Sequence, residues 1–135
     1  MLSKKITYTI GKIPNTEAII NVYNSSGIIR PTDDKARIRK MYDNSNLVIA
    51  AWNGFELVGI SRAITDYCYS CYLSDLAIKK EFQKEGIGKE LINRTRNEIG
   101  NNTTLILLAA PGAIDYYPKV GFSKIENGYM IKREI

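Results

Sequence analysis

The residues best suited to chemistry lie in a glycine-containing loop, Gln83-Lys-Glu-Gly-Ile-Gly88, between an apolar run and a helical pattern. The first amides of a helix have no partners within the helix and carry partial positive charge, so they form a site for anions. Gly86 and Gly88 allow an anion to approach the backbone, and Lys84 and Lys89 add positive charge. The loop therefore indicates a phosphate-binding site, although the same glycines could simply serve a tight turn.

The spacing of the glycines argues against two common nucleotide sites. A Walker loop needs four residues between its glycines, followed by Lys-Ser or Lys-Thr, and this loop has neither. A dinucleotide-binding fingerprint needs a third glycine where this chain has Leu91. Nucleoside triphosphates and dinucleotides are therefore disfavoured as ligands.

The same segment resembles the Gln/Arg-x-x-Gly-x-Gly/Ala motif of the GCN5-related N-acetyltransferase (GNAT) family. By this resemblance the loop amides hold the pyrophosphate of coenzyme A, with acetyl-CoA as the cosubstrate and no metal. The preceding Leu76-Ala-Ile78 looks like the family's strand end, whose backbone pairs with the pantetheine arm. The cofactor-binding residues implied are Leu76, Ala77, Ile78, Gln83, Lys84, Glu85, Gly86, Ile87, Gly88 and Lys89.

A second segment, Tyr116-Tyr-Pro-Lys-Val-Gly-Phe122, resembles the family's aromatic-Tyr-x-x-aliphatic-Gly-Phe motif. The resemblance makes Tyr117 the acid that protonates the departing thiolate. Tyrosine suits this role because its ordinary pKa, about 10, keeps the proton on the phenol at neutral pH. The alternative is that both tyrosines only pack, and Tyr116 is expected to belong to the core.

The reaction so implied is acyl transfer from acetyl-CoA to a primary amine by direct attack in a ternary complex. The amine must lose a proton first, and the sequence contains no histidine to accept it. Asp75, beside the strand end, is the first candidate base, with Glu56 and Asp66 weaker candidates. A water path is the other possibility, and Asp75 could instead fix the strand or face solvent.

The resemblance to the GNAT family implies that the acceptor binds between the first two helices and a final hairpin. Arg30 could recognise a carboxylate or phosphate on the acceptor there, or it could be an ordinary surface arginine. Trp52, Tyr67, Tyr69 and Tyr72 could line a pocket or pack on the sheet. The partner is a small-molecule amine or an exposed protein amine, and the family's frequent dimers make a homodimer a further expectation.

The hydrophobic pattern predicts alternating strands and helices. Strands are expected at residues 5–10, 47–52, 55–63, 71–78 and 104–109, and helices at 15–24, 32–42, 87–99 and 113–120. Asn15 or Thr16 is the expected cap of the first helix and Thr32 that of the second, and Asn53-Gly54 predicts a tight turn between two strands. The third helix is expected to turn one face inward: Ile87, Leu91, Ile92, Thr95 and Ile99. A last hairpin is expected from 123–126 and 129–133, across Asn127-Gly128. This order predicts a single-domain α/β (α+β) fold like that of the family, with a mixed, mostly antiparallel central sheet of six to seven strands flanked by about four helices.

Composition limits the alternatives. The 135 residues favour one domain over residues 1–135, and the net charge of +5 is a mild excess that suits an anionic ligand. No segment resembles a signal peptide or membrane helix, so we expect a cytoplasmic chain without a membrane partner.

Cys68 and Cys71 lack the second ligand pair of a metal site. A non-catalytic acyl-CoA-binding module is the main alternative, and the lack of a basic run disfavours nucleic-acid binding.

Overall fold

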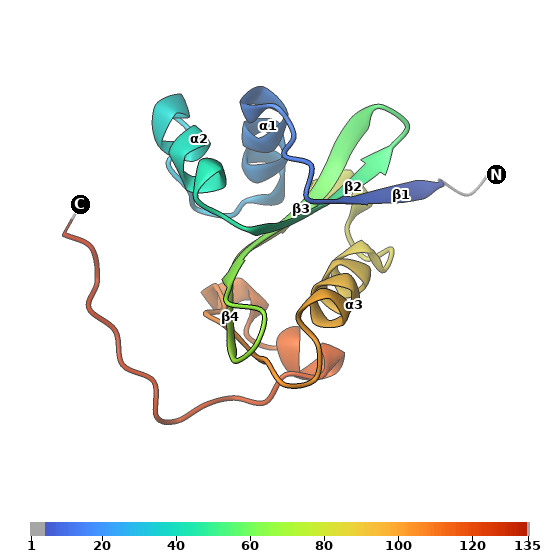
Figure 1. Ribbon diagram of the computed structural model, residues 1–135. Helices are drawn as coiled ribbons and strands as arrows, with labels where there is room; N and C mark the ends of the chain where they lie inside the picture. The colour runs from blue at the N-terminus through green and yellow to red at the C-terminus, as the bar shows by residue number, and fades with distance from the viewer. Residues whose placement is uncertain (1–4, 135) are drawn as a thin grey trace.

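The computed structural model describes residues 5–134, which form one five-stranded sheet with helices on both faces (Figure 1). The sheet order is β1-β2-β3-β4-β5, and only the β4–β5 pairing is parallel. Helices α1 and α2 cover one face, and α3 covers the other. The strands are β1 (Ile6–Ile10), β2 (Leu47–Asn53), β3 (Glu56–Thr65), β4 (Ser70–Ile78) and β5 (Thr104–Leu107). The helices are α1 (Thr16–Ser26), α2 (Lys35–Asp43) and α3 (Ile87–Ile99).

Local signals set the ends of α1 and α2. The side chain of Asn15 accepts a hydrogen bond from the Ala18 amide at 2.8 Å, so Asn15 caps α1 as its sequence position predicts. The predicted cap of α2, Thr32, is wrong because residues 31–34 first form a turn. The side chain of Asp34 caps α2 instead, accepting from the Arg37 amide at 3.0 Å.

The hairpin of β2 and β3 turns at Asn53-Gly54, as the sequence predicts, with Gly54 at a φ of 64°. Beyond that turn β3 passes close beneath α3. A side chain on Gly59 would place its Cβ 3.2 Å from Cγ2 of Ile87, so glycine allows the helix to pack closely on the sheet. The predicted inward face of α3 is confirmed, since Ile87, Leu91, Ile92, Thr95 and Ile99 are all buried.

Strands β4 and β5 separate soon after they meet. Their parallel register runs only from Ser70–Thr104 to Leu73–Leu107. β4 then continues to Ile78, while the chain after β5 leaves the sheet and turns at Pro111–Ala113. The last half of β4 is therefore unpaired on the β5 side.

The predicted sheet of six to seven strands with about four helices is too large. The described residues contain five strands and three α-helices. The helix expected at 113–120 is replaced by two short 3₁₀ turns, Pro111–Ala113 and Tyr117–Val120, because Pro118 has no amide hydrogen for a continuing helix. The hairpin expected at 123–126 and 129–133 is absent, and Gly128 does not take the positive φ that such a turn needs.

A buried ionic cluster joins the α1–α2 layer to the sheet. Asp75 on β4 is 1% exposed and accepts from Arg62 Nε at 2.5 Å and Arg30 Nε at 2.6 Å. The Tyr23 hydroxyl on α1 also donates to Asp75 at 2.6 Å, and it is hydrogen-bonded to Tyr42 on α2. One carboxylate thus connects α1, the loop after α1, β3 and β4.

The cluster also fixes the ionisation of its members. Burial alone would raise the pKa of Asp75, but hydrogen bonding and charge from Arg62, Tyr23 and Arg30 bring it below the ordinary value. Burial raises the pKa of Tyr23 and of Tyr42, and the Asp75 charge raises both further. Asp75 is therefore ionised, and both tyrosines are protonated, throughout the neutral range.

We expect Asp75→Asn to lower the free energy of unfolding near neutral pH by about 3–5 kcal/mol, because the buried Arg62 guanidinium loses its carboxylate. The folded pKa of Asp75 is lowered, so its contribution is present above the unfolded value of about 3.9 and is lost as the pH falls through the lower folded value. The difference between the unmodified protein and the variant should therefore narrow below about pH 4. Urea denaturation near neutral pH and in acid measures both effects.

Asp43→Asn is the matched control, since Asp43 pairs with Arg39 on the exposed side of α2. It should change the free energy of unfolding by about 0.5 kcal/mol or less. An Asp75→Asn effect as small as this, or one unchanged in acid, would contradict the structural role of Asp75.

Candidate active site

A cleft of about 1070 Å³ opens where β4 and β5 separate. Its walls are the end of β4, the start of α3, the loop after α1 and the chain that follows β5. Most of the residues that the sequence singled out line it: Arg30, Leu76, Ala77, Ile78, Gln83, Lys84, Gly86, Ile87, Gly88, Lys89 and Tyr117. Glu85 and Asp75 do not line this cleft.

The loop before α3 presents backbone amides to the cleft. Gly86 caps α3 with a φ of 86° and contributes no side-chain cap, so the first amides of the helix are left for a ligand. Lys84 has a positive φ of 64°, which is uncommon outside glycine and gives the loop its tight shape. The Gln83 side chain donates to the Ile78 carbonyl at 2.9 Å, so it joins the loop to the end of β4.

Tyr116 closes over the start of α3. A Cβ on Gly88 would lie 2.9 Å from the Tyr116 hydroxyl, so glycine is what lets the phenol lie against the helix. The expectation that Tyr116 belongs to the core is wrong, because its side chain lines the cleft and is 37% exposed. The sequence alone does not distinguish which of two adjacent tyrosines is buried and which lines a cleft.

Tyr117 lies in the same wall but more deeply. Its ring meets Phe122 edge-on, with centroids 5.5 Å apart, and meets Tyr116 in the same manner at 5.3 Å. Burial and the neighbouring Tyr116 raise the pKa of Tyr117, while the positive charge of Arg30 acts to lower it. The phenol therefore keeps its proton at neutral pH, as a proton donor must.

Arg30 forms part of the cleft wall and is held there by three hydrogen bonds. Besides the bond to Asp75, Nη1 donates to its neighbour's carbonyl at 2.6 Å and Nη2 donates to the Ser74 carbonyl at 2.8 Å. The guanidinium is thus fixed beside the open end of β4. Asp75, which does not line the cleft, accepts from Arg30 at one carboxylate oxygen and from Arg62 at the other.

The charged side chains that line the cleft are all positive: Arg30, Lys84 and Lys89. The weaker base candidates are elsewhere. Glu56 is paired with Lys79 at 3.0 Å, and Asp66 accepts three backbone hydrogen bonds in its turn, which lower its pKa to about 2. Trp52, Tyr67, Tyr69 and Tyr72 are also outside the lining of the cleft. The cleft therefore suits an anionic ligand. Its lining, within the described residues 5–134, includes no carboxylate that could act as a base.

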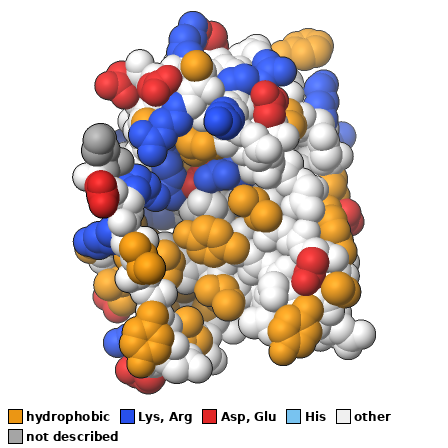
Figure 2. Space-filling model, turned by 60° about the vertical axis from the view of Figure 1, so that its left-hand side comes forward, with side chains coloured by type: hydrophobic (Ala, Val, Ile, Leu, Met, Phe, Trp, Pro, Cys, Tyr) orange, Lys and Arg blue, Asp and Glu red, His pale blue; other side chains and the backbone are white. Residues whose placement is uncertain are grey.

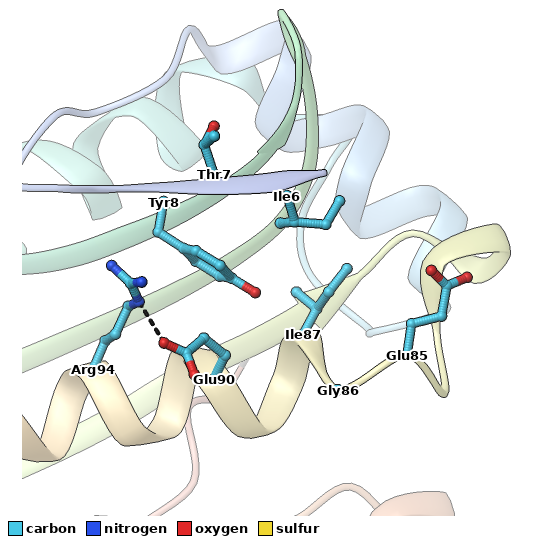
Figure 3. Close-up of a pocket in the computed structure, with 8 residues that line it drawn as sticks. All are labelled: Ile6, Thr7, Tyr8, Glu85, Gly86, Ile87, Glu90 and Arg94. Atoms are coloured by element: carbon cyan, nitrogen blue, oxygen red, sulfur yellow. Dashed lines mark hydrogen bonds and ion pairs between the residues drawn. The ribbon is translucent and has the colours of Figure 1, made fainter. Parts of the chain in front are cut away.

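A second, shallower hollow of about 620 Å³ lies on the other side of the loop, between β1 and α3 (Figure 3). Arg94 lies over the Tyr8 ring at 4.3 Å and is paired with Glu90 at 2.7 Å. Of the predicted site residues, only Glu85, Gly86 and Ile87 line this hollow. The strand end and Tyr117 are absent from it, so the larger cleft is the candidate active site.

Among residues 5–134, no group of three or more His, Cys, Asp or Glu side chains is arranged to hold a metal ion. None of the helices in this part of the chain has the length and apolarity needed to cross a membrane.

Comparisons with known proteins match this architecture. ycf52 of Pyropia yezoensis, an uncharacterised N-acetyltransferase, is 27% identical over 131 residues, covering 93% of this chain and 74% of that protein. The chain spans only 54% of the length of a ycf52-like N-acetyltransferase of Prochlorococcus marinus and 29% of that of GCN5-related N-acetyltransferase 2 of Arabidopsis thaliana.

Solved structures show the same fold at low identity. A protein of unknown function from meticillin-resistant Staphylococcus aureus has a TM-score of 0.82 at 22% identity, covering 96% of this chain and all of that one. An aminoglycoside acetyltransferase from an uncultured soil metagenomic sample has a TM-score of 0.69 at 19% identity, covering 96% of each chain.

The family assignment comes from the sequence itself. A family model described as the acetyltransferase (GNAT) domain matches residues 22–132, which include the loop before α3, the end of β4 and both tyrosines of the cleft. The chain therefore belongs to the GCN5-related N-acetyltransferase (GNAT) family, in which acetyl-CoA-dependent N-acetylation is general.

Proposed function

We propose that this chain transfers an acetyl group from acetyl-CoA to a primary amine by direct attack within a ternary complex. One observation supports this most: a single cleft combines the free amides of a helix start, an unpaired strand edge and a protonated tyrosine. These features suit three parts of the cosubstrate: its pyrophosphate, its amide-containing arm and its thioester.

The loop suits the pyrophosphate. Amides of residues 84–89 would hold its oxygens, and the ammonium groups of Lys84 and Lys89 would add attraction. Gly88 leaves its backbone accessible, and Gln83 keeps the loop in place through Ile78. The side chain of Glu85 lines the hollow on the β1 side, so this residue would contribute to the site only through its backbone.

The open edge of β4 suits the pantetheine arm. Leu76, Ala77 and Ile78 lie beyond the last register pair with β5, so their backbone on that side is available for strand-like pairing with the arm's amides, apart from the Ile78 carbonyl that Gln83 holds. A backbone amide in this stretch would also stabilise the oxyanion formed when the amine attacks. Acetyl-CoA supplies the activated acyl group, and the strand positions it.

Tyr117 would act as the acid. Its hydroxyl would donate its proton to the departing sulfur, and the raised pKa keeps that proton available. We propose that Asp75 positions Arg30 and β4 and takes no proton from the amine, because its carboxylate is buried, doubly paired and has a lowered pKa. The acceptor's ammonium group would instead lose its proton to water before the attack.

The acceptor would enter near Arg30. The cleft's positive lining disfavours a highly cationic acceptor, even though a structural neighbour is an aminoglycoside acetyltransferase. We propose an amine on a neutral or anionic small molecule, or an exposed protein amine, with Arg30 adding positive potential at the entrance. Because the chain spans only about half or less of the length of some curated relatives, the activity of the whole protein is also a proposal.

A non-catalytic acyl-CoA-binding module is the second candidate, since the loop and the strand edge would serve it equally well. It gives Tyr117 no chemical role, so a change of that residue separates the two functions.

We expect Tyr117→Phe to lower kcat by about 100-fold or more while leaving coenzyme A binding within about threefold, because it removes the proton donor and little contact area. Release of free thiol from acetyl-CoA in the presence of an amine panel gives the rate. Calorimetric titration with coenzyme A gives the binding.

Tyr116→Phe is the matched control, since it removes the neighbouring hydroxyl from the same wall. It should retain most of kcat. Equal losses in the two variants would rule out a specific proton transfer by Tyr117, and coenzyme A binding with no turnover of any amine would favour the binding module.

We expect Gly88→Val to weaken coenzyme A binding by about tenfold or more, because its side chain would occupy the approach to the loop amides and displace the Tyr116 hydroxyl. The loss of the coenzyme-induced rise in Tm, with the Tm of the free protein measured beside it, checks this. Undiminished coenzyme binding by folded Gly88→Val would mean that the anion site lies elsewhere.

A further inference from the structure

The C-terminal segment 123–134, here called the arm, contacts little of its own chain. No hydrogen bond or ion pair is found for it among residues 5–134, and Figure 1 shows it running away from the body. Yet it carries large apolar side chains: Tyr129 and Ile131 are fully exposed, and Ile125 and Met130 are more than half exposed. An arm of this composition gains stability only when something covers it.

Strand β5 presents a free edge. It pairs with β4 on one side and with no described strand on the other. Edge strands normally carry lysine, proline or a bulge that prevents pairing with another chain, but Thr104-Leu-Ile-Leu-Leu108 has none of these. The opposite edge strand, β1, lies between Lys5 and Lys12. The edge of β5 is therefore open to an additional strand.

The sheet next to this edge also has an uncovered apolar row. Ile64, Tyr72 and Ile106 are register partners across β3, β4 and β5 and are 48%, 40% and 40% exposed. Leu108, beyond the end of β5, is 58% exposed. On the side of the molecule where the arm lies, apolar side chains gather in the lower part and basic ones mostly in the upper part (Figure 2). Strands that are apolar on both faces are typical of the interior of a sheet.

We propose that the arm of one chain binds along the β5 edge of a second copy and covers its row Ile64–Tyr72–Ile106, and that the second copy does the same in return. The arm carries the large apolar side chains that such an added strand would bury, and it runs away from the body of its own chain. A twofold exchange satisfies both free surfaces with no third component.

The exchange bears on the cleft, because Leu107 and Leu108 belong to both the edge region and the cleft lining. A partner's arm on the free side of β5 would therefore support the strand that leads into this wall of the cleft. The exchange does not depend on the proposed reaction, since the free edge and the apolar row exist whatever the cleft binds.

Sedimentation analysis of the full chain, with and without residues 123–135, tests the exchange. We expect the full chain to be a dimer and the truncated chain a monomer that keeps the circular dichroism spectrum of a folded protein. A monomeric full chain, or a dimer that survives truncation, would overturn the proposal.

A variant with point changes guards against a truncation that fails to fold. Tyr129→Asp combined with Ile131→Asp should raise the Kd of the dimer by about tenfold or more, because both side chains would otherwise be buried at the new interface. Phe55→Asp is the matched control: Phe55 is equally exposed but lies in the β2–β3 turn, so the Kd should stay within about twofold. Equal effects in the two proteins would contradict the interface.

Crosslinking distinguishes exchange from folding back within one chain. Cysteines are introduced by Ile106→Cys and Ile131→Cys in a Cys68→Ser background, where the remaining Cys71 is buried. A bismaleimide should then give a covalent dimer on a denaturing gel. A product linked only within single chains, or no crosslinked dimer, would overturn the exchange.

Discussion

Strands β4 and β5 stay paired for only four register positions, and the cleft exists because they then separate. A parallel strand that continued to pair would leave no backbone of β4 free at Leu76–Ile78. The separation begins at a β-bulge in β4, where Ser74 has no register partner between the pairs Leu73–Ala63 and Asp75–Arg62. The chain after β5 then turns away at Pro111–Ala113, and Tyr116 comes to lie against the start of α3. One interruption of pairing thus supplies the strand edge, the space beside it and the wall that carries Tyr117.

The other wall depends on a buried charge. Asp75 lies on β4 one residue before the exposed edge, and its two oxygens hold Arg62 and Arg30 from different parts of the chain. Breaking such a pair is costly because the remaining charge stays buried, so the cluster resists any shift of β4 relative to the helices. Arg30, on the wall of the cleft, is therefore held in place by a residue that does not line it. This arrangement supports the proposal that Asp75, although near the cleft, takes no part in proton transfer.

Features set by local sequence could be predicted, and those set by distant partners could not. The turn at Asn53-Gly54, the inner face of α3 and the glycine loop are each encoded within a few residues. The role of Asp75 depends on Arg30, which is 45 positions away, and the facing of Tyr116 depends on its approach to Gly88. The C-terminal hairpin had good local signals, but an isolated hairpin has too little to bury, so its formation depends on a sheet edge that only tertiary or quaternary structure supplies.

β5 is subject to two opposing demands. As a cleft wall it must stop pairing early with β4, and as a short apolar strand it needs cover on its other side. A strand that is both short and uncovered contributes little to holding the cleft wall, since each unpaired backbone group on its free edge is satisfied only by water. Pairing that edge with another strand would hold β5 from the side opposite the cleft and leave the β4 edge free. Association through the arm and the openness of the cleft are therefore compatible requirements on the same four residues.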